Sequence, residues 1–103
     1  MITHKVLHTG FLHKKGFRTT DTRLVSFKGR TFKFSYEAYN SGENFDCDLF
    51  DGQKFNRIFC HQDLGIPKEN SAYLLLDEKE IKSHIEKLFK AGIQFITNVL
   101  TNS

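Results

Sequence analysis

The sequence predicts a single α+β domain over residues 1–103, in which an antiparallel meander of about six strands packs against one long C-terminal helix. The first observation is the segment 30–39, where apolar and polar side chains alternate. Its apolar positions are Phe32, Phe34, Tyr36 and Ala38. A period of two is typical of a strand with one buried face. The second observation is an apolar stripe at intervals of three and four over residues 81–100, which indicates a helix that shields this face.

Turn-forming residues divide the first three quarters of the chain into short segments. The segments expected to form strands are 3–13, 17–27, 30–39, 45–49, 54–61 and 71–76. Glycine marks the turns at 14–16 and 28–30, and Asp51-Gly52 is a strong hairpin signal. The segments 40–44 and 62–70 are loops, and the second contains the only proline. Short turns between consecutive strands predict antiparallel pairing in chain order.

The helix is expected to begin after Asp77, whose carboxylate can accept hydrogen bonds from the first turn. Glu80 lies three residues later and completes a capping-box pattern. We expect the helix to reach about Leu100, because the apolar stripe crosses Gly92 without a break, and a kink at this glycine fits the pattern. The alternative is a helix that ends at Ala91 and is followed by a last strand, since Ala91-Gly92 is a good helix stop and residues 93–97 have a strand-like composition.

Length and composition indicate a small protein with a core rich in aromatic rings. The chain has 103 residues, and eleven of them are phenylalanine. It lacks a stretch of about 18 apolar residues, and its first residues lack the basic start and apolar run of a signal peptide. We therefore expect a cytoplasmic protein in which Cys47 and Cys60 are free thiols.

Charge is distributed unevenly along the chain. Residues 1–35 contain eight Lys and Arg and one acid, whereas residues 36–63 contain six acids and two basic residues. Cations interleaved with phenylalanines are typical of surfaces that bind single-stranded nucleic acid. The residues of this hypothetical site are Lys14, Lys15, Arg18, Arg23, Lys28, Arg30 and Lys33. The alternative interpretation is that the rings form the core side of strands whose outer face is rich in lysine.

The segment 28–34 resembles the Lys-Gly-aromatic-x-Phe run of RNA-recognition and cold-shock strands. It departs from that run at two positions, because Arg30 replaces the first aromatic residue and Thr31 the small residue. The resemblance implies nucleic-acid binding at this strand.

The acidic middle segment supports a different hypothesis. Its acids are Glu43, Asp46, Asp48 and Asp51. Presented together, they would suit a toxin-neutralising, immunity-like protein that binds a basic target. A calcium loop is not expected, because Gly52 falls at the seventh position counted from Asp46 and the loop requires its glycine at the sixth.

The histidines and cysteines form no diagnostic metal or catalytic pattern. His4 and His8 would share a face in a regular strand and could form a metal site with Cys60 or His61 from another strand, but their spacing is not that of a zinc site. Cys60 and His61 are neighbours and would point to opposite faces of a strand. His84 is expected on the helix, three residues after Ile81, as a residue at the boundary of the apolar stripe rather than a catalyst. We assign no catalytic residue, no metal and no cofactor.

Taken as a whole, this α+β pattern is similar in kind to the small orphan proteins that bacterial integron gene cassettes encode. No motif carries the similarity, and no functional residue is transferred from it. The leading hypothesis is a small binding or protein-interaction domain, forming a homodimer, whose ligand or protein partner docks against the sheet or a cleft between sheet and helix. A helix of about 20 residues cannot cover both faces of such a sheet, so some apolar surface should remain exposed.

Overall fold

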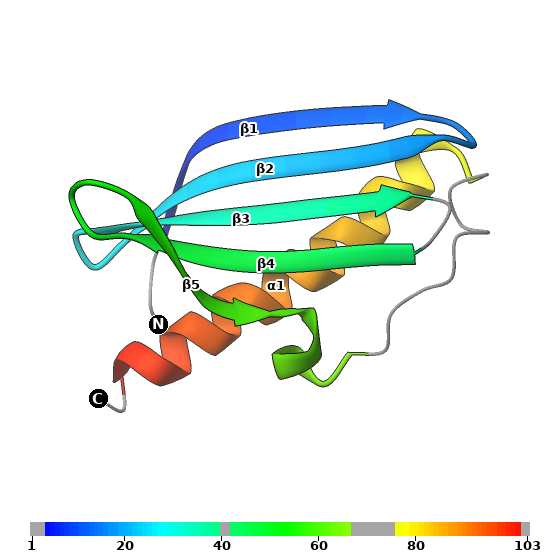
Figure 1. Ribbon diagram of the computed structural model, residues 1–103. Helices are drawn as coiled ribbons and strands as arrows, with labels where there is room; N and C mark the ends of the chain where they lie inside the picture. Colours follow the sequence, from blue (N-terminus) through cyan, green and yellow to red (C-terminus); the bar gives the residue numbers. More distant parts are fainter. Residues whose placement is uncertain (1–3, 40–41, 67–75, 102–103) are drawn as a thin grey trace.

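In a computed structural model that describes residues 4–39, 42–66 and 76–101, the chain folds into an antiparallel sheet with one long helix across one of its faces (Figure 1). The strands are β1 (Lys5–Lys14), β2 (Arg18–Phe27), β3 (Arg30–Tyr39), β4 (Gly42–Phe50) and β5 (Phe55–Cys60). A short 3₁₀ helix, η1 (His61–Leu64), follows β5, and the long helix is α1 (Glu78–Thr101). The strand order in the sheet is β1-β2-β3-β4-β5, so every strand pairs with its neighbour in the chain.

The α+β class, the antiparallel meander and the C-terminal helix are confirmed. The described residues contain five strands rather than about six, and the sixth expected strand, 71–76, falls outside them apart from Leu76. Strand β4 begins at Gly42, three residues before the expected start. Helix α1 continues through Gly92, so the alternative with a final strand over 93–97 is wrong.

The turns form where glycine and aspartate predicted them. Lys28 and Gly29 both have positive φ angles, of 51° and 76°, which is the backbone of a type I′ hairpin turn. At the β4–β5 turn, Oδ1 of Asp51 accepts hydrogen bonds from the backbone N–H groups of Gln53 and Lys54, each at 2.9 Å. At the start of α1, the backbone N–H of Glu80 donates to Oδ1 of Asp77 at 2.9 Å, as the capping pattern predicted.

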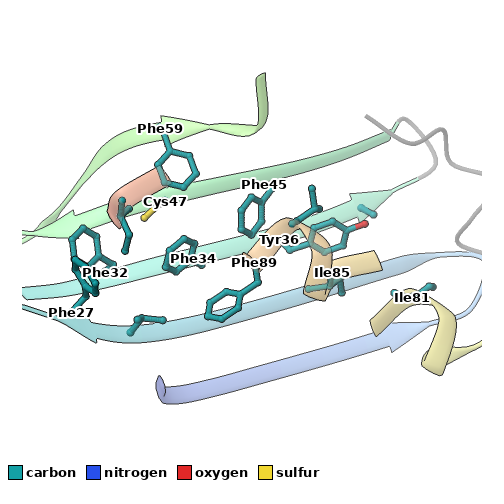
Figure 2. Close-up of a cluster of buried hydrophobic side chains, with 14 residues drawn as sticks. Phe27, Phe32, Phe34, Tyr36, Phe45, Cys47, Phe59, Ile81, Ile85 and Phe89 are labelled. Carbon is teal, nitrogen blue, oxygen red and sulfur yellow. The ribbon is translucent and has the colours of Figure 1, made fainter. Parts of the chain in front are cut away.

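The core lies between the helix and one face of the sheet, which we call the inner face (Figure 2). The alternation predicted for β3 is confirmed, because Phe32, Phe34, Tyr36 and Ala38 are all buried. The other strands contribute Val25, Phe27, Phe45, Cys47 and Phe59, and the helix contributes Ile81, Ile85, Leu88, Phe89 and Ile96. The rings contact one another directly, and the centroid of Phe34 lies 5.2 Å from that of Phe89 and 5.9 Å from that of Phe45.

At Gly92 the helix backbone comes close to this layer of rings. A Cβ atom placed on Gly92 would lie 2.7 Å from Cε1 of Phe34 and 3.2 Å from Cε2 of Phe45. Because no side chain separates the helix from the sheet here, both rings pack against the helix backbone itself. The glycine therefore allows close packing within a continuous helix, and it is not the helix stop that the sequence also allowed.

We expect Gly92→Ala to destabilise the protein. In an exposed helix this change stabilises by about 1 kcal/mol, but overpacking a core costs about 1–3 kcal/mol, and Phe34 is too enclosed to move aside. Urea denaturation of the variant measures the difference. In a Phe34→Leu background, Gly92→Ala should lower the free energy of unfolding by less than it does in the wild-type background. A Gly92→Ala protein as stable as the wild type would contradict this account of the contact.

The two thiols are free, as predicted, and differ in their surroundings. Cys47 is completely buried on the inner face, and burial, together with the nearby Asp48, raises the pKa of its thiol. Cys60 is half-buried at the end of β5, and its Sγ lies 3.5 Å from Oδ2 of Asp63.

We expect a thiol reagent such as Ellman's reagent to modify Cys60 in the native protein at pH 8 and to leave Cys47 unmodified. Only the thiolate reacts, and burial disfavours it at Cys47. Peptide mapping after a short exposure identifies the modified residue, and unfolding in urea should release both thiols for reaction. Equal modification of the two residues in the native protein would show that β4 is not enclosed as described.

Candidate functional site

Strand β1 is the most exposed element of the fold and forms one edge of the sheet (Figure 1). Among the described residues, no strand pairs with its outer side. Eight of its ten residues are exposed, and only Phe11 and His13 are half-buried. The exposed residues include Val6, Leu7 and Leu12, so this edge offers apolar side chains as well as backbone groups.

The pairing register shows which backbone groups of β1 point away from the sheet. The two-residue turn at Lys28-Gly29 makes Phe27 and Arg30 a hydrogen-bonded pair. From Phe27 back along β2, the backbone N–H and C=O groups of successive residues point alternately toward β3 and toward β1. Every second residue of β2 therefore bonds to β1. These residues are Thr20, Thr22 and Leu24, and their partners on β1 are Leu12, Gly10 and His8. It follows that Thr9, Phe11 and His13 direct their N–H and C=O groups outward.

A bulge divides β1 into two parts. The register shifts between Val6 and His8, which places Leu7 outside the regular pairing. Val6 then pairs with the buried Val25 and His8 with Leu24, so His4 and His8 do not share a face as they would in a regular strand. His4 instead lies against the ring of Phe89, 5.9 Å between centroids, on the inner face.

The described structure does not gather the seven cations of the nucleic-acid hypothesis on one surface. Lys14, Lys15 and Arg18 lie at the β1–β2 turn, while Lys28 and Arg30 lie at the opposite end of the sheet (Figure 1). Phe17 lies in the β1–β2 turn and is 73% exposed. Lys33 is on the outer face, with its Nζ 4.6 Å from the centroid of Phe55 and 4.0 Å from a carboxylate oxygen of Asp48.

Arg23 lies between the sheet and the helix. Its guanidinium donates to both carboxylate oxygens of Asp21, at 3.2 and 3.1 Å, and to Glu86 on α1 at 2.5 Å. It also stacks over the ring of Phe89, 4.5 Å from the centroid. Burial lowers the pKa of Arg23, and the bonds to Asp21 and Glu86 more than compensate, so the pKa is raised overall. Arg23 thus joins β2 to α1.

The acids of the middle segment are also engaged within the protein. Asp46 and Asp48 lie on the outer face and both pair with Arg57, and the hydrogen bond that Arg57 donates to Asp48 raises the pKa of this arginine. Asp51 holds the β4–β5 turn, and the backbone N–H groups of Lys54 and Gln53 lower the pKa of its carboxyl. Glu43 is 1% exposed, so it does not join the others at the surface.

Glu43 forms a buried polar cluster that the sequence did not reveal. It pairs with Ala38 in the sheet and therefore points to the inner face. The hydroxyl of Tyr36 donates to its Oε2 at 2.8 Å, and Nε2 of His84 lies 2.8 Å from the same oxygen. Nε2 of His61, from η1, lies 3.9 Å from Oε1. The cluster ties β3, β4, η1 and α1 together at one corner of the core.

His61 is the least satisfied member of this cluster. Its side chain is 2% exposed, and neither ring nitrogen has a hydrogen-bond partner among the described residues. No three His, Cys, Asp or Glu side chains in the described part of the chain are arranged to hold a metal ion. The alternation of side chains along β4 could have indicated that Glu43 is buried. Glu43 lies two residues before Phe45 and therefore on the same face of the strand.

We expect Glu43→Ala to destabilise the protein by about 2–3 kcal/mol, because it removes the buried acceptor of the Tyr36 hydroxyl. Glu37→Ala is the matched control. Glu37 lies on the adjacent strand β3 and is exposed. Among the described residues it accepts one exposed bond, from Tyr39, so its loss should change stability by no more than about 0.5 kcal/mol. Urea unfolding compares the two variants. Equal losses would show that the Glu43 cluster has no special part in stability.

The centre of the outer face of the sheet is polar. A shallow hollow of about 390 Å³ lies over its centre. Arginine, hydroxyl and acidic side chains line it, among them Arg18, Thr22, Ser35, Glu37, Asp46 and Arg57. The positive and negative groups are mixed, which favours neither an anion nor a cation.

A second apolar surface, besides the exposed side chains of β1, lies at the end of the sheet near the C-terminal turns of α1. A groove of about 300 Å³ lies there. It is lined by one cation, Arg30, and by apolar side chains that include Phe32, Ile58, Phe95, Ile96 and Val99. Val99 is 51% exposed and Ile58 41% exposed, so these walls are partly open to solvent.

Comparison of the chain with protein-family models, with curated proteins and with solved structures finds no match. In the part of the chain that the structure describes, no helix combines the length and the apolar character needed to cross a bilayer. The functional argument therefore rests on the surfaces described above.

Proposed function

We propose that the chain is a small protein-interaction domain that binds an extended, acidic segment of a partner protein along the edge of β1. The single observation that carries this proposal is the exposure of a ten-residue edge strand. Added strands gain main-chain hydrogen bonds along such an edge, and side-chain contacts then give specificity. The outward N–H and C=O groups of Thr9, Phe11 and His13 are the available partners for such a strand.

The charge of the edge defines the partner. Lys5 and Lys14 lie at the two ends of β1, and residues 4–20 contain no acid. Leu7 and Leu12, 49% and 41% exposed, lie between the two lysines. The complementary segment has acidic residues at its ends and β-branched or apolar residues between them.

A second copy of β1 fits this edge less well. Antiparallel pairing of two copies about the centre of the strand brings Lys5 of one copy opposite Lys14 of the other, and like charges directly opposite destabilise a pair. The bulge at Leu7 also interrupts a regular pairing. The homodimer that the sequence suggested is therefore replaced, as our proposal, by a complex with an acidic partner.

The first test uses a fluorescent dodecapeptide of alternating valine and threonine with two glutamates at each end, and its counterpart with lysines at the ends. Fluorescence anisotropy should show binding of the acidic peptide that weakens as salt rises. Thr9→Pro should reduce this binding about tenfold or more, because proline removes one outward N–H while leaving the bonds to β2 in place. Thr9→Ala, which keeps the N–H, should bind nearly as the wild type.

The charge is tested separately with the double variant Lys5→Glu and Lys14→Glu, both at exposed positions. It should prefer the lysine-ended peptide, reversing the wild-type preference. The proposal fails if neither peptide binds, if a folded Thr9→Pro protein binds as the wild type, or if the preference does not reverse. A dimeric mass by light scattering that Thr9→Pro makes monomeric would instead assign the edge to a second copy.

A further inference from the structure

The groove at the C-terminal end of α1 is a second surface, and it does not involve β1. Its floor is buried, since Phe32 and Ile96 are each 1% exposed. Its walls are the exposed side chains of Val99 and Ile58. With a volume of about 300 Å³, it lies at the lower end of the range of small-molecule sites.

The charge at this groove has one sign. Arg30 is exposed at its rim and forms no ion pair with any described residue. Lys28, two residues earlier in the same turn, lies over the ring of Phe27 and also lacks an acidic partner in the described part of the chain. None of the lining residues is acidic. An apolar surface with an unpaired cation at one end is complementary to an apolar chain that ends in an anion.

The helix fixes the direction in which such a ligand lies. The last turn of α1 contains no basic residue, so the partial negative charge of its terminal carbonyl groups is not offset by a side chain of the helix. That end of the groove disfavours an anion, whereas the turn that carries Arg30 favours one.

We propose that this groove binds a fatty carboxylate, with its head group at Arg30 and its hydrocarbon chain along Phe95 and Val99. A second copy of the protein is a weaker candidate, because stable interfaces bury about 1,200 Å² or more and need a larger continuous apolar surface than this groove provides.

The experiment is titration of the full chain with sodium dodecanoate below its micelle-forming concentration, followed by calorimetry. Saturable one-to-one binding is expected, and each methylene removed from the chain should weaken it by about fourfold. Dodecyltrimethylammonium, with the same tail and the opposite charge, should bind more weakly. Light scattering on the same samples reports the oligomeric state.

Two variants locate the site without disturbing the core. Val99→Glu places an acid on the exposed wall and should weaken dodecanoate binding by about tenfold or more. Arg30→Gln should weaken it by about two- to fivefold, as expected for an exposed charge pair. Lys79→Gln, an exposed cation in the first turn of α1, is the matched control and should have no effect.

The proposal is overturned if dodecanoate shows no saturable binding, if a folded Val99→Glu protein binds it as the wild type, or if the cationic detergent binds equally well. It is also overturned if the wild type is a dimer that Val99→Glu converts to a monomer, because a second copy would then cover the groove. None of these outcomes bears on the peptide experiment, since Thr9, Lys5 and Lys14 do not line the groove.

Discussion

The contact between the backbone of α1 at Gly92 and the rings of Phe34 and Phe45 determines the rest of the arrangement. It lies near the middle of the sheet, and it sets the depth at which the helix rests on the inner face. Apolar residues of the helix before and after this point, such as Ile85 and Ile96, then meet the sheet on either side of it. A helix seated on the central strands in this way covers the core and does not reach the outer side of β1. The groove beside Val99 lies at one end of this crossing, whereas the edge is open because β1 is the first strand of the meander.

Much of the fold could be predicted from local patterns, because those patterns are themselves physical requirements. Side chains alternate between apolar and polar in β3 because one face of the strand packs against the helix. Asp77 marks the start of the helix because its carboxylate accepts a hydrogen bond from the backbone N–H of Glu80. Gly92 could not be interpreted in the same way. Glycine is favourable both at a helix end and at a close contact, and the residue it touches, Phe34, is far away in sequence.

The candidate sites were less predictable, because charge counts along a chain do not show which charges meet. Arg23 was counted with the surface cations, yet Asp21 lies two residues earlier on the same face of β2, and Glu86 approaches from the helix. Glu43 was counted with the surface acids, although the period of β4 extends back to it and turns it inward. In both cases the strand period gave the direction of the side chain, but a partner from another element completed the contact, Glu86 for Arg23 and His84 for Glu43. The edge position of β1 followed from the predicted meander, whereas its bulge did not.

An exposed edge strand normally invites pairing between identical molecules, and lysines and bulges are common protections against it. In the complex that we propose, the same features of β1 also select the partner. Lys5 and Lys14 repel a second copy of the strand and attract a segment with acidic ends, so one pair of charges both limits self-association and supplies complementarity. The regular part of the edge lies on the C-terminal side of the bulge, where Thr9, Phe11 and His13 face outward. Protection against aggregation and recognition of a partner are therefore compatible in this strand, because the charges oppose self-pairing while the backbone groups remain available.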